Sequence, residues 1–462
     1  MVNGLAQGSC PAGLAAGGAE GLCVREGDPG GITECVCAIA ESPRAPRAWR
    51  IAFAVSAALS VFFLALIVYL VATGIGVWGL NVPVAWAFDV TNFVFWIGLA
   101  HAGTFISAIL FLFRQPWRAS VSRLAEAMTI FSVLCAAIFP TIHLGRIWVA
   151  YWALPYPNYL RMWPNFRSPL VWDVFAIGIY FVVSLVFWYL GMVPDLAALR
   201  DRARTPRRRL VYGLLALGWR GSARHWAWHR QAYLLLAGLV TALVISVHSV
   251  VSYNFAVTAL PGWHSTIFPP YFVVGAVLSG LAMVLTMAVP ARHLFGLKEI
   301  ISTRHLEKVG ILLLAMSCLI AYAWLMEAFT AWYSGNMHER LAALSRATGP
   351  LRWACAATVL CSVVVPQLLW SRRVRGRTGW LFAVALLVNV GMWLERFVII
   401  VASLSRDYLP SSWRDYAPTW VEVGMLAGSF GLFLMLLLLF CRYLPMVALA
   451  ELKEAASGAA RE

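Results

Sequence analysis

The sequence predicts an all-α integral membrane protein with about ten transmembrane helices. Hydrophobic residues make up 61% of the 462-residue chain and charged residues only 12%, whereas a soluble domain carries about 25% charged residues. The longest apolar runs exceed the roughly 18 residues that a helix needs to cross about 30 Å of hydrocarbon. A membrane β-barrel is excluded, because it would show short segments of alternating hydrophobicity instead.

The chain divides into three zones. A low-complexity tail rich in Gly and Ala covers 1–50, a membrane domain covers 51–449, and a short polar end covers 450–462. The tail lacks the apolar core of a cleavable signal peptide. The apolar runs predict transmembrane helices near residues 51–74, 86–113, 124–153, 170–192, 231–258, 266–290, 309–333, 350–370, 378–403 and 419–449.

Lysine and arginine are distributed unevenly over the connections between these spans. If the N-terminus and every second connection lie on one side, that side has 27 Lys and Arg residues and the opposite side has 7. The positive-inside rule makes the richer side cytoplasmic, so both termini are predicted in the cytoplasm. The net charge of +15 then reflects topology and contact with anionic lipid head groups, not a nucleic-acid surface.

A weak internal repeat indicates how the spans group. Ser168-Pro169-Leu170 precedes the fourth span, and Gly349-Pro350-Leu351 precedes the eighth. The repeat predicts two four-helix bundles, formed by spans two to five (about 86–258) and spans six to nine (about 266–403). The first and last spans would be peripheral helices.

Nine charged or histidine residues within the spans all fall towards the outer end of their helices. A charged side chain in hydrocarbon costs about 2.5–3.5 kcal/mol even on lenient scales. Their common depth therefore predicts a polar site near the outer membrane face, where protons and electrons are handled. The nine residues are Asp89, His143, Arg146, Asp173, His248, Glu327, Glu395, Arg396 and Glu422.

The first candidate set joins the third and fourth spans. His143 and Arg146 are three residues apart and share one face if the helix continues, and Asp173 lies one turn into the next span. A hydroquinone must lose two protons during oxidation, and a histidine paired with a carboxylate provides two acceptors. Alternatively, Asp173 caps its helix or forms an ion pair with Arg146.

The fifth span provides a second set, consisting of His248, Ser252, Tyr253 and Asn254. His248 and Ser252 share a face at i, i+4. These residues either bind a substrate or form the hydrogen bonds between helices that polar residues usually make in bundles.

Glu395 and Arg396 are adjacent near the outer end of the ninth span. Neighbouring helical residues point about 100° apart, so each is expected to need its own partner. They either tie the bundles together or contact substrate. A weaker proton path is predicted from residues of several spans, namely Asp89, His101, Thr104, Ser107, Glu126 and Glu395.

No metal site is expected in this chain. The tail cysteines Cys10, Cys23, Cys35 and Cys37 fit no zinc or ferredoxin spacing. Haem b ligation by His143 and His248 is an alternative that requires the two histidines to face each other.

Several stretches together resemble the NrfD/PsrC family of quinone-reactive membrane subunits, and within it most closely the ActC-type membrane subunits of alternative complex III. The similarity covers roughly 50–450. It is carried by Phe88-Asp89-Val90-Thr91-Asn92-Phe93, Phe139-Pro140-Thr141-Ile142-His143-Leu144-Gly145-Arg146, Trp163-Pro164-Asn165-Phe166-Arg167-Ser168-Pro169-Leu170-Val171-Trp172-Asp173, Val247-His248-Ser249-Val250-Val251-Ser252, Pro261-Gly262-Trp263-His264-Ser265-Thr266, and Gly391-Met392-Trp393-Leu394-Glu395-Arg396-Phe397.

The resemblance implies a site for menaquinol or ubiquinol at the outer face of a bacterial inner membrane. His143 and Asp173 match the family's histidine and aspartate, and Arg146, His264 and Arg396 would help to bind quinol. Asn254 stands where an acidic residue is common, which puts a proton step there in doubt. The chain would carry no haem of its own.

The resemblance also implies partners. Electrons would pass to a periplasmic iron–sulfur subunit, then to c-type cytochrome subunits and onward to a terminal oxidase, alongside a second NrfD-like membrane subunit. The aromatic-rich connection at 154–169 is a candidate docking face.

Two other functions remain open from the sequence. One is a quinone-reducing anchor of a molybdoenzyme or hydrogenase. The other is a secondary transporter or proton channel, which the off-centre polar residues and the nearly uncharged inner half disfavour.

Overall fold

The computed structural model describes residues 29–42, 45–153 and 166–459. Within these ranges every regular element is a helix or a helical turn, which confirms the predicted all-α class. Ten helices are long and apolar enough to cross a membrane, as predicted. The positions Cys10 and Cys23, and most of the aromatic connection at 154–169, lie outside the described residues.

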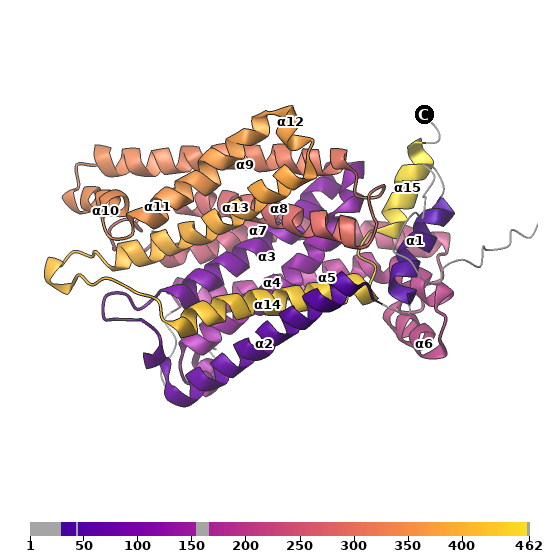
Figure 1. Ribbon diagram of the computed structural model, residues 1–462, viewed down its shortest axis with the longest axis horizontal. Helices are drawn as coiled ribbons and strands as arrows, with labels where there is room; N and C mark the ends of the chain where they lie inside the picture. Colours follow the sequence, from indigo (N-terminus) through magenta and orange to yellow (C-terminus); the bar gives the residue numbers. More distant parts are fainter. Residues whose placement is uncertain (1–28, 43–44, 154–165, 460–462) are drawn as a thin grey trace, which may run out of the picture.

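The ten helices run side by side along the long axis of the molecule (Figure 1). Their bounds are α2 (Arg47–Thr73), α3 (Phe88–Leu112), α4 (Ser122–His143), α5 (Pro169–Arg202), α7 (Ala223–Ala256), α8 (Phe268–Leu294), α9 (Thr303–Tyr333), α11 with the turns that continue it (Arg352–Trp370), α13 with its final π-turn (Thr378–Ala402) and α14 (Trp420–Tyr443).

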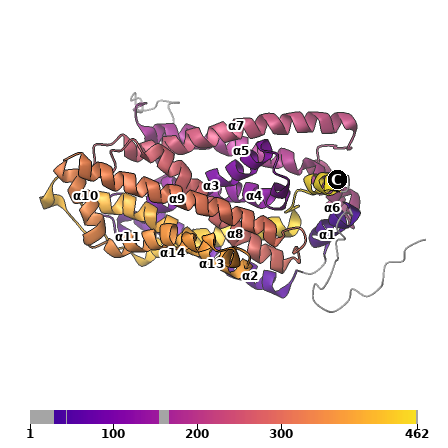
Figure 2. The ribbon, with the colours of Figure 1, turned by 90° about the horizontal axis from the view of Figure 1, so that it is seen from above.

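Short helices cover the two ends of this assembly. α1 (Pro29–Glu41), α6 (Pro206–Leu215) and α15 (Leu449–Ala459) gather at one end, and α10 (Met337–Thr348) lies at the other (Figures 1 and 2). The first end carries most of the basic connections, so we call it the inner end and the opposite end the outer end. The naming follows the charge distribution.

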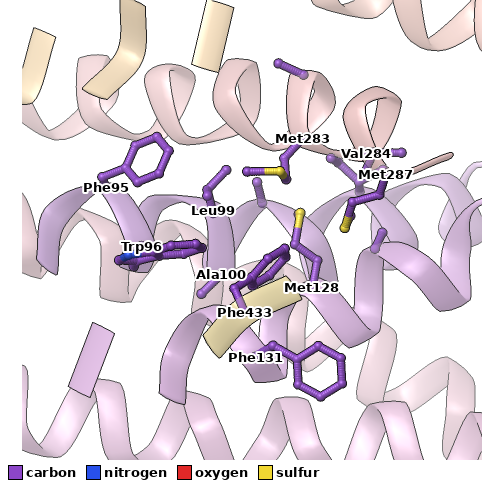
Figure 3. Packing of buried hydrophobic residues seen from close by; sticks show 14 of the residues in the cluster. Phe95, Trp96, Leu99, Ala100, Met128, Phe131, Met283, Val284, Met287 and Phe433 are labelled. Carbon is purple, nitrogen blue, oxygen red and sulfur yellow. The ribbon is translucent and has the colours of Figure 1, made fainter. Parts of the chain in front are cut away.

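The core forms around α3, which is almost entirely buried. α3 packs against α4, α7 and α8, while α13 and α9 cover the other side of α8, and α14 pairs with α2 at the edge. Large side chains from α3, α4, α8 and α14 interdigitate there, among them Trp96, Met283 and Phe433 (Figure 3). The predicted grouping into two bundles of four stays a prediction.

A glycine allows α3 and α8 to approach closely. A side chain at Gly280 of α8 would collide with Ala102 of α3. Contacts between small residues are the usual way for membrane helices to gain packing energy, because lipid provides no hydrophobic driving force between them.

The third predicted span is too long at its C-terminal end. α4 ends at His143, and Gly145 follows with a φ of +67°, a left-handed conformation that a helix does not contain. Arg146 therefore lies beyond the helix and is exposed. The prediction that His143 and Arg146 share a helical face is wrong for this reason.

Two of the nine polar residues are tied into the scaffold at the outer end. Glu422 forms a capping box with Thr419 at the start of α14, and it accepts hydrogen bonds from the Tyr416 hydroxyl (2.6 Å) and the Gly79 amide (2.9 Å). Glu327 forms an ion pair of 2.5 Å with Arg346 of α10. Both carboxylates therefore fix the loops around the bundle.

Candidate functional site

An aspartate–histidine pair joins the outer ends of α3 and α4. Asp89 lies in the first turn of α3 and His143 is the last residue of α4, so the neighbouring helices bring them together. The His143 Nδ1 atom is in close contact with the Asp89 Oδ2 atom. Asp89 is 3% exposed, whereas the side chain of His143 is 29% exposed. A carboxylate on Nδ1 holds the proton there and leaves Nε2 of a neutral ring as an acceptor.

A second carboxylate lies between α5 and α7. The Asn254 side-chain amide donates a hydrogen bond of 2.5 Å to Asp173 Oδ2. Both residues are more than nine-tenths buried. The remaining oxygens, Asp173 Oδ1 and Asn254 Oδ1, have no hydrogen-bond partner within the described residues. Buried polar atoms are rarely left unpaired, so these two acceptors are suited to a ligand that donates hydrogen bonds.

The predicted direct pair of His143 with Asp173 does not form, because each residue bonds a different side chain. His143 is engaged by Asp89, and Asp173 is engaged by Asn254. The alternative ion pair of Asp173 with Arg146 does not form either within the described residues. Sequence spacing placed the residues at one depth, but both partners that it indicated for Asp173 are wrong, because helix packing brings Asn254 to this carboxylate and Asp89 to His143.

His248 is paired deeper in the bundle than predicted. Its Nδ1 atom lies 2.8 Å from the Nδ1 atom of His101 on α3, and both residues are fully buried. A bond between the two Nδ1 atoms requires one ring to donate and the other to accept, which fits two neutral rings of opposite tautomer. His143 and His248 thus bond different partners through their Nδ1 atoms.

The other predicted quinol-binding residues do not join the outer pairs. The Ser252 hydroxyl donates to the Ser249 carbonyl oxygen (2.7 Å) within its own helix. Tyr253 is half-buried, and His264 is exposed, with its ring 3.1 Å from the Thr258 carbonyl oxygen. For Ser252, the predicted hydrogen bond between helices is therefore wrong, because the hydroxyl bonds a carbonyl oxygen of its own helix.

Glu395 and Arg396 form a buried group in the second half of the chain. Glu395 Oε1 accepts hydrogen bonds from Tyr271 and from the Trp324 indole (3.2 Å). The Arg396 guanidinium lies over the Phe272 ring and also 3.1 Å from Glu395 Oε2. The expectation that the two residues do not pair with each other is therefore wrong, because the long arginine side chain reaches back to its neighbour.

Four of the six predicted proton-path residues form two groups below the outer pairs, whereas Asp89 belongs to an outer pair and Glu395 to the group with Arg396. The His101 ring lies edge-on to Tyr180 of α5, with ring centres 4.4 Å apart, and the Tyr180 hydroxyl contacts Thr104. Further inward, the Ser107 hydroxyl donates to Glu126 Oε1 at 2.6 Å. The sequence missed Tyr180, because a tyrosine in an apolar run is typical of helix packing.

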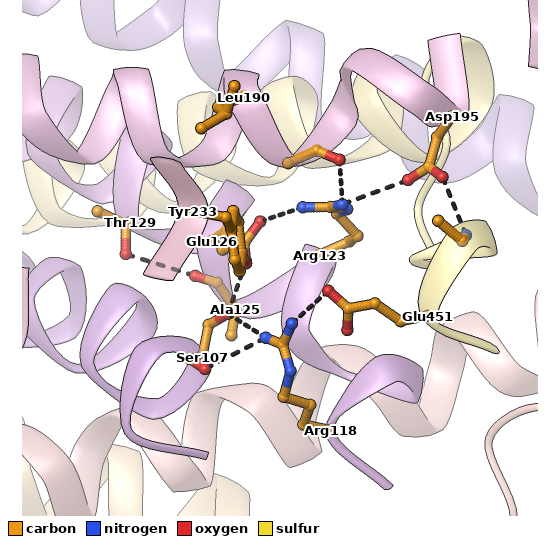
Figure 4. Close-up of polar contacts among 12 residues, drawn as sticks. Ser107, Arg118, Arg123, Ala125, Glu126, Thr129, Leu190, Asp195, Tyr233 and Glu451 are labelled. Carbon is orange, nitrogen blue, oxygen red and sulfur yellow. Dashed lines mark hydrogen bonds and ion pairs between the residues drawn. The ribbon is translucent and has the colours of Figure 1, made fainter. Parts of the chain in front are cut away.

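Glu126 belongs to a charged cluster at the inner end, defined here as Arg118, Arg123, Glu126, Asp195 and Glu451 (Figure 4). All of these residues except the half-buried Glu451 are buried. Arg123 lies 2.8 Å from Glu126 and 3.3 Å from Asp195. Arg118 pairs with Glu451 of α15. The prediction of a nearly uncharged inner half is wrong, because the arginines assigned to a cytoplasmic connection fold inward onto these carboxylates.

The inner charged cluster also affects the pKa of a carboxyl group on α15. Burial raises the pKa of the Glu451 carboxyl, while Arg118 and Arg123 act in the opposite direction. A buried charge is tolerated when a partner compensates it, and each carboxylate of the cluster has an arginine neighbour. Within the residues that the structure describes, no group of three or more His, Cys, Asp or Glu residues is arranged to hold a metal ion.

Comparison with known proteins places this arrangement among redox membrane subunits. A family model described as polysulphide reductase, NrfD, matches residues 76–406. That range holds both outer pairs, the histidine pair and the Glu395–Arg396 group.

Three relatives span most of the chain. The chain is 22% identical over 421 residues to a putative membrane subunit of dimethyl sulfoxide reductase from Halobacterium salinarum, covering 83% of this chain and 91% of that protein. It is 22% identical over 381 residues to a subunit of selenate reductase from Mesobacillus selenatarsenatis, covering 78% and 86%. It is 20% identical over 347 residues to an Hdr-like menaquinol oxidoreductase integral membrane subunit of Archaeoglobus fulgidus, covering 72% and 75%.

Proposed function

The chain belongs to the polysulphide reductase NrfD family, and from its outer pairs we propose that it binds and oxidises quinol as the membrane subunit of a redox complex. The site lies near the outer face of the membrane. The name of one relative includes menaquinol as a substrate, which supports quinol as the class of substrate.

The observation that carries this proposal is the set of free acceptors at the outer ends of the helices. Asp173 Oδ1 and Asn254 Oδ1 are buried and unpaired within the described residues. Asp89 bonds His143 through Nδ1, and among the described residues Nε2 has no hydrogen-bond partner. A hydroquinone has two hydroxyl groups, and each needs an acceptor when it ionises.

The proposed reaction uses the two acceptors in parallel. One hydroxyl of the hydroquinone donates to His143 Nε2 and the other to the Asp173 carboxylate. Loss of two electrons and two protons gives the quinone, and the protons reside on these two side chains. Asp89 stabilises the imidazolium that forms on His143, and Asn254 holds the carboxylate of Asp173 in place.

The two electrons leave the site for partner proteins. We place the chain in an alternative complex III-type assembly with a periplasmic iron–sulfur subunit, c-type cytochrome subunits, a second NrfD-like subunit and a terminal oxidase. Both termini then lie in the cytoplasm of a bacterium, by the positive-inside rule. The direction of electron flow depends on partner potentials, so a quinone-reducing anchor is the second candidate, favoured by the reductase names of two relatives.

The deeper polar groups support a proton path as a further part of the proposal. His101 and His248 lie below the outer pairs, Tyr180 with Thr104 follow, and Ser107 with Glu126 reach the inner cluster. Proton uptake by vesicles that contain the complex tests this path directly. Glu126→Gln should slow proton uptake from the inner side while quinol oxidation continues, and equal uptake by wild type and variant would remove Glu126 from the path.

The test of the central proposal is quinol-driven reduction of the native acceptor by the assembled complex. His143→Ala and Asp173→Asn should each lose turnover with assembly intact. Normal turnover in both variants would move the site away from the outer pairs and revive the transporter or channel interpretation.

A further inference from the structure

A large apolar cavity lies away from the outer pairs. It has a volume of about 610 Å³ and is enclosed by α2, α4, α8, α13 and α14. None of the residues proposed to oxidise quinol lines it. Ligand pockets have volumes of about 300–1,000 Å³ and are mostly apolar, with few polar groups that fix orientation. The cavity has this size and character.

The lining is aromatic and aliphatic, with contributions from both halves of the chain. Met283 and Met287 of α8 and Phe433 of α14 contribute to it (Figure 3), together with Trp393 of α13. No Lys, Arg, Asp or Glu residue is among the lining residues. A phosphate head group would find no compensating charge here, so the lining favours a neutral ligand.

One residue of the cavity wall has a buried acceptor without a partner among the described residues. Asn389 of α13 lines the cavity and is 6% exposed. Its amide nitrogen donates to the Thr286 hydroxyl (3.1 Å), and that hydroxyl in turn donates to the Ala282 carbonyl oxygen (2.9 Å). The chain of bonds fixes the amide, because the Thr286 hydroxyl has no second hydrogen to donate. Asn389 Oδ1 is left as an unpaired buried acceptor within the described residues.

Asn389 lies further from the outer end of the helices than the outer pairs do. The residue is thirteen positions before the end of the span at Ala402, or about 20 Å along a helix axis. At its outer end the cavity reaches Trp393, whose indole donates to Asn92 (2.8 Å). Asn92 lies one turn from Asp89 on α3, so one helix connects the two regions.

We propose that this cavity is a second binding site for a hydroquinone, in its reduced form, with the ring hydroxyl donating to Asn389 Oδ1. The apolar walls hold the ring and part of an isoprenoid tail. An acyl chain of a lipid has no donor for Asn389, and an oxidised quinone has none either. This inference rests on quinol as the substrate class of the proposed function.

Photolabelling of the assembled complex tests the inference independently of turnover. The probe is a hydroquinone with a diazirine on its isoprenoid tail, used under anaerobic conditions in its reduced and oxidised forms, and labelled peptides are mapped by mass spectrometry. The reduced probe should label the segments 283–294 and 386–394 several times more strongly than the oxidised probe. Equal labelling by the two forms, or displacement by phospholipid but not by unlabelled hydroquinone, would overturn the inference.

Two variants separate the polar contact from the shape of the cavity. Asn389→Leu keeps the size but removes the acceptor, so labelling by the reduced probe should fall about threefold to tenfold, the value of one hydrogen bond. Val390→Phe narrows the cavity and should weaken labelling by both forms. Unchanged labelling in Asn389→Leu would contradict the assigned contact.

A third variant distinguishes failure of this inference from failure of the proposed function. His143→Ala should abolish quinol turnover yet leave labelling around Asn389 as in wild type. If His143→Ala loses turnover but the reduced probe labels the segments around Asn389 in neither wild type nor variants, the second site is rejected and the outer site is retained. Full turnover in His143→Ala with strong inner labelling would retain the cavity site and reject the outer one.

Discussion

The outer pairs and the inner charged cluster both contain buried carboxylates, yet they differ in whether the buried acceptor oxygens have partners. In the inner cluster, Arg123 contacts Glu126 and Asp195 together. At the outer end, Asp173 and Asn254 each keep one oxygen without a described partner. Buried carboxylates whose oxygens are all paired stabilise a fold, whereas unpaired acceptors are a cost that a ligand removes. The difference supports the proposal that the outer pairs bind the substrate, while the inner cluster stabilises the scaffold.

The largest expected effect is on His143. Replacement by Ala removes one of two proposed proton acceptors, and general acid–base groups contribute about 10²–10⁴-fold to rate. Turnover of quinol by the assembled complex should fall by that factor. The matched control is His293→Ala, because His293 is an exposed histidine in the last turn of α8 and lies outside the outer pairs. Quinol turnover by the His143→Ala complex within twofold of wild-type turnover would contradict the role of the outer pairs in catalysis.

Asp173→Asn is expected to have the next largest effect. The amide keeps the size of the side chain but does not take up the proton, so turnover should fall by about 10²-fold at every pH. Stopped-flow measurement across a pH series checks this result. Asp415→Asn is the control, because Asp415 forms an exposed ion pair with Arg406. Turnover rates equal to those of wild type across the pH series would count against Asp173 as an acceptor.

Arg123→Ala should instead lower stability. Removing Arg123 leaves Glu126 and Asp195 without their shared cation, and breaking a buried pair costs about 3–5 kcal/mol. The melting temperature in detergent should fall, while turnover per folded complex stays near that of wild type. Arg230→Ala, at an exposed pair with Glu454, should melt like wild type. A stable Arg123→Ala complex without turnover would assign catalysis to the inner cluster.

Tyr416→Phe should have the smallest effect. It removes the hydroxyl that donates to Glu422, and one such hydrogen bond contributes about 0.5–1.5 kcal/mol. Thermal unfolding should shift slightly with turnover unchanged. A loss of turnover would show that the cap of α14 positions the outer site.

The number and order of helices followed from the sequence, because long apolar runs have few alternatives in a membrane. The positions of His143 and Asp173 near the outer ends of their helices also followed from the sequence, and their role in a site stays a prediction. Their actual partners, Asp89 and Asn254, were not predicted as pairs, because helix packing decides which side chains meet. Arg146 was misplaced because the helix ends before Gly145, a break that the glycine itself could have indicated.

The inner cluster was missed for a different physical reason. Arg118 and Arg123 have the appearance of an ordinary basic connection, and Glu451 lies in a polar end far away in sequence. Only the return of α15 to the bundle brings Glu451 to Arg118. The spacing of Arg123 and Glu126 at i, i+3 was the one local signal of a pair.

The most direct test compares His143→Ala with Arg123→Ala, measuring quinol-driven reduction of the native acceptor per assembled complex. We expect a loss of about 10²-fold or more for His143→Ala and near wild-type turnover for Arg123→Ala despite its lower melting temperature. The reverse pattern would contradict the assignment of quinol oxidation to the outer pairs and of scaffold stability to the inner charged cluster.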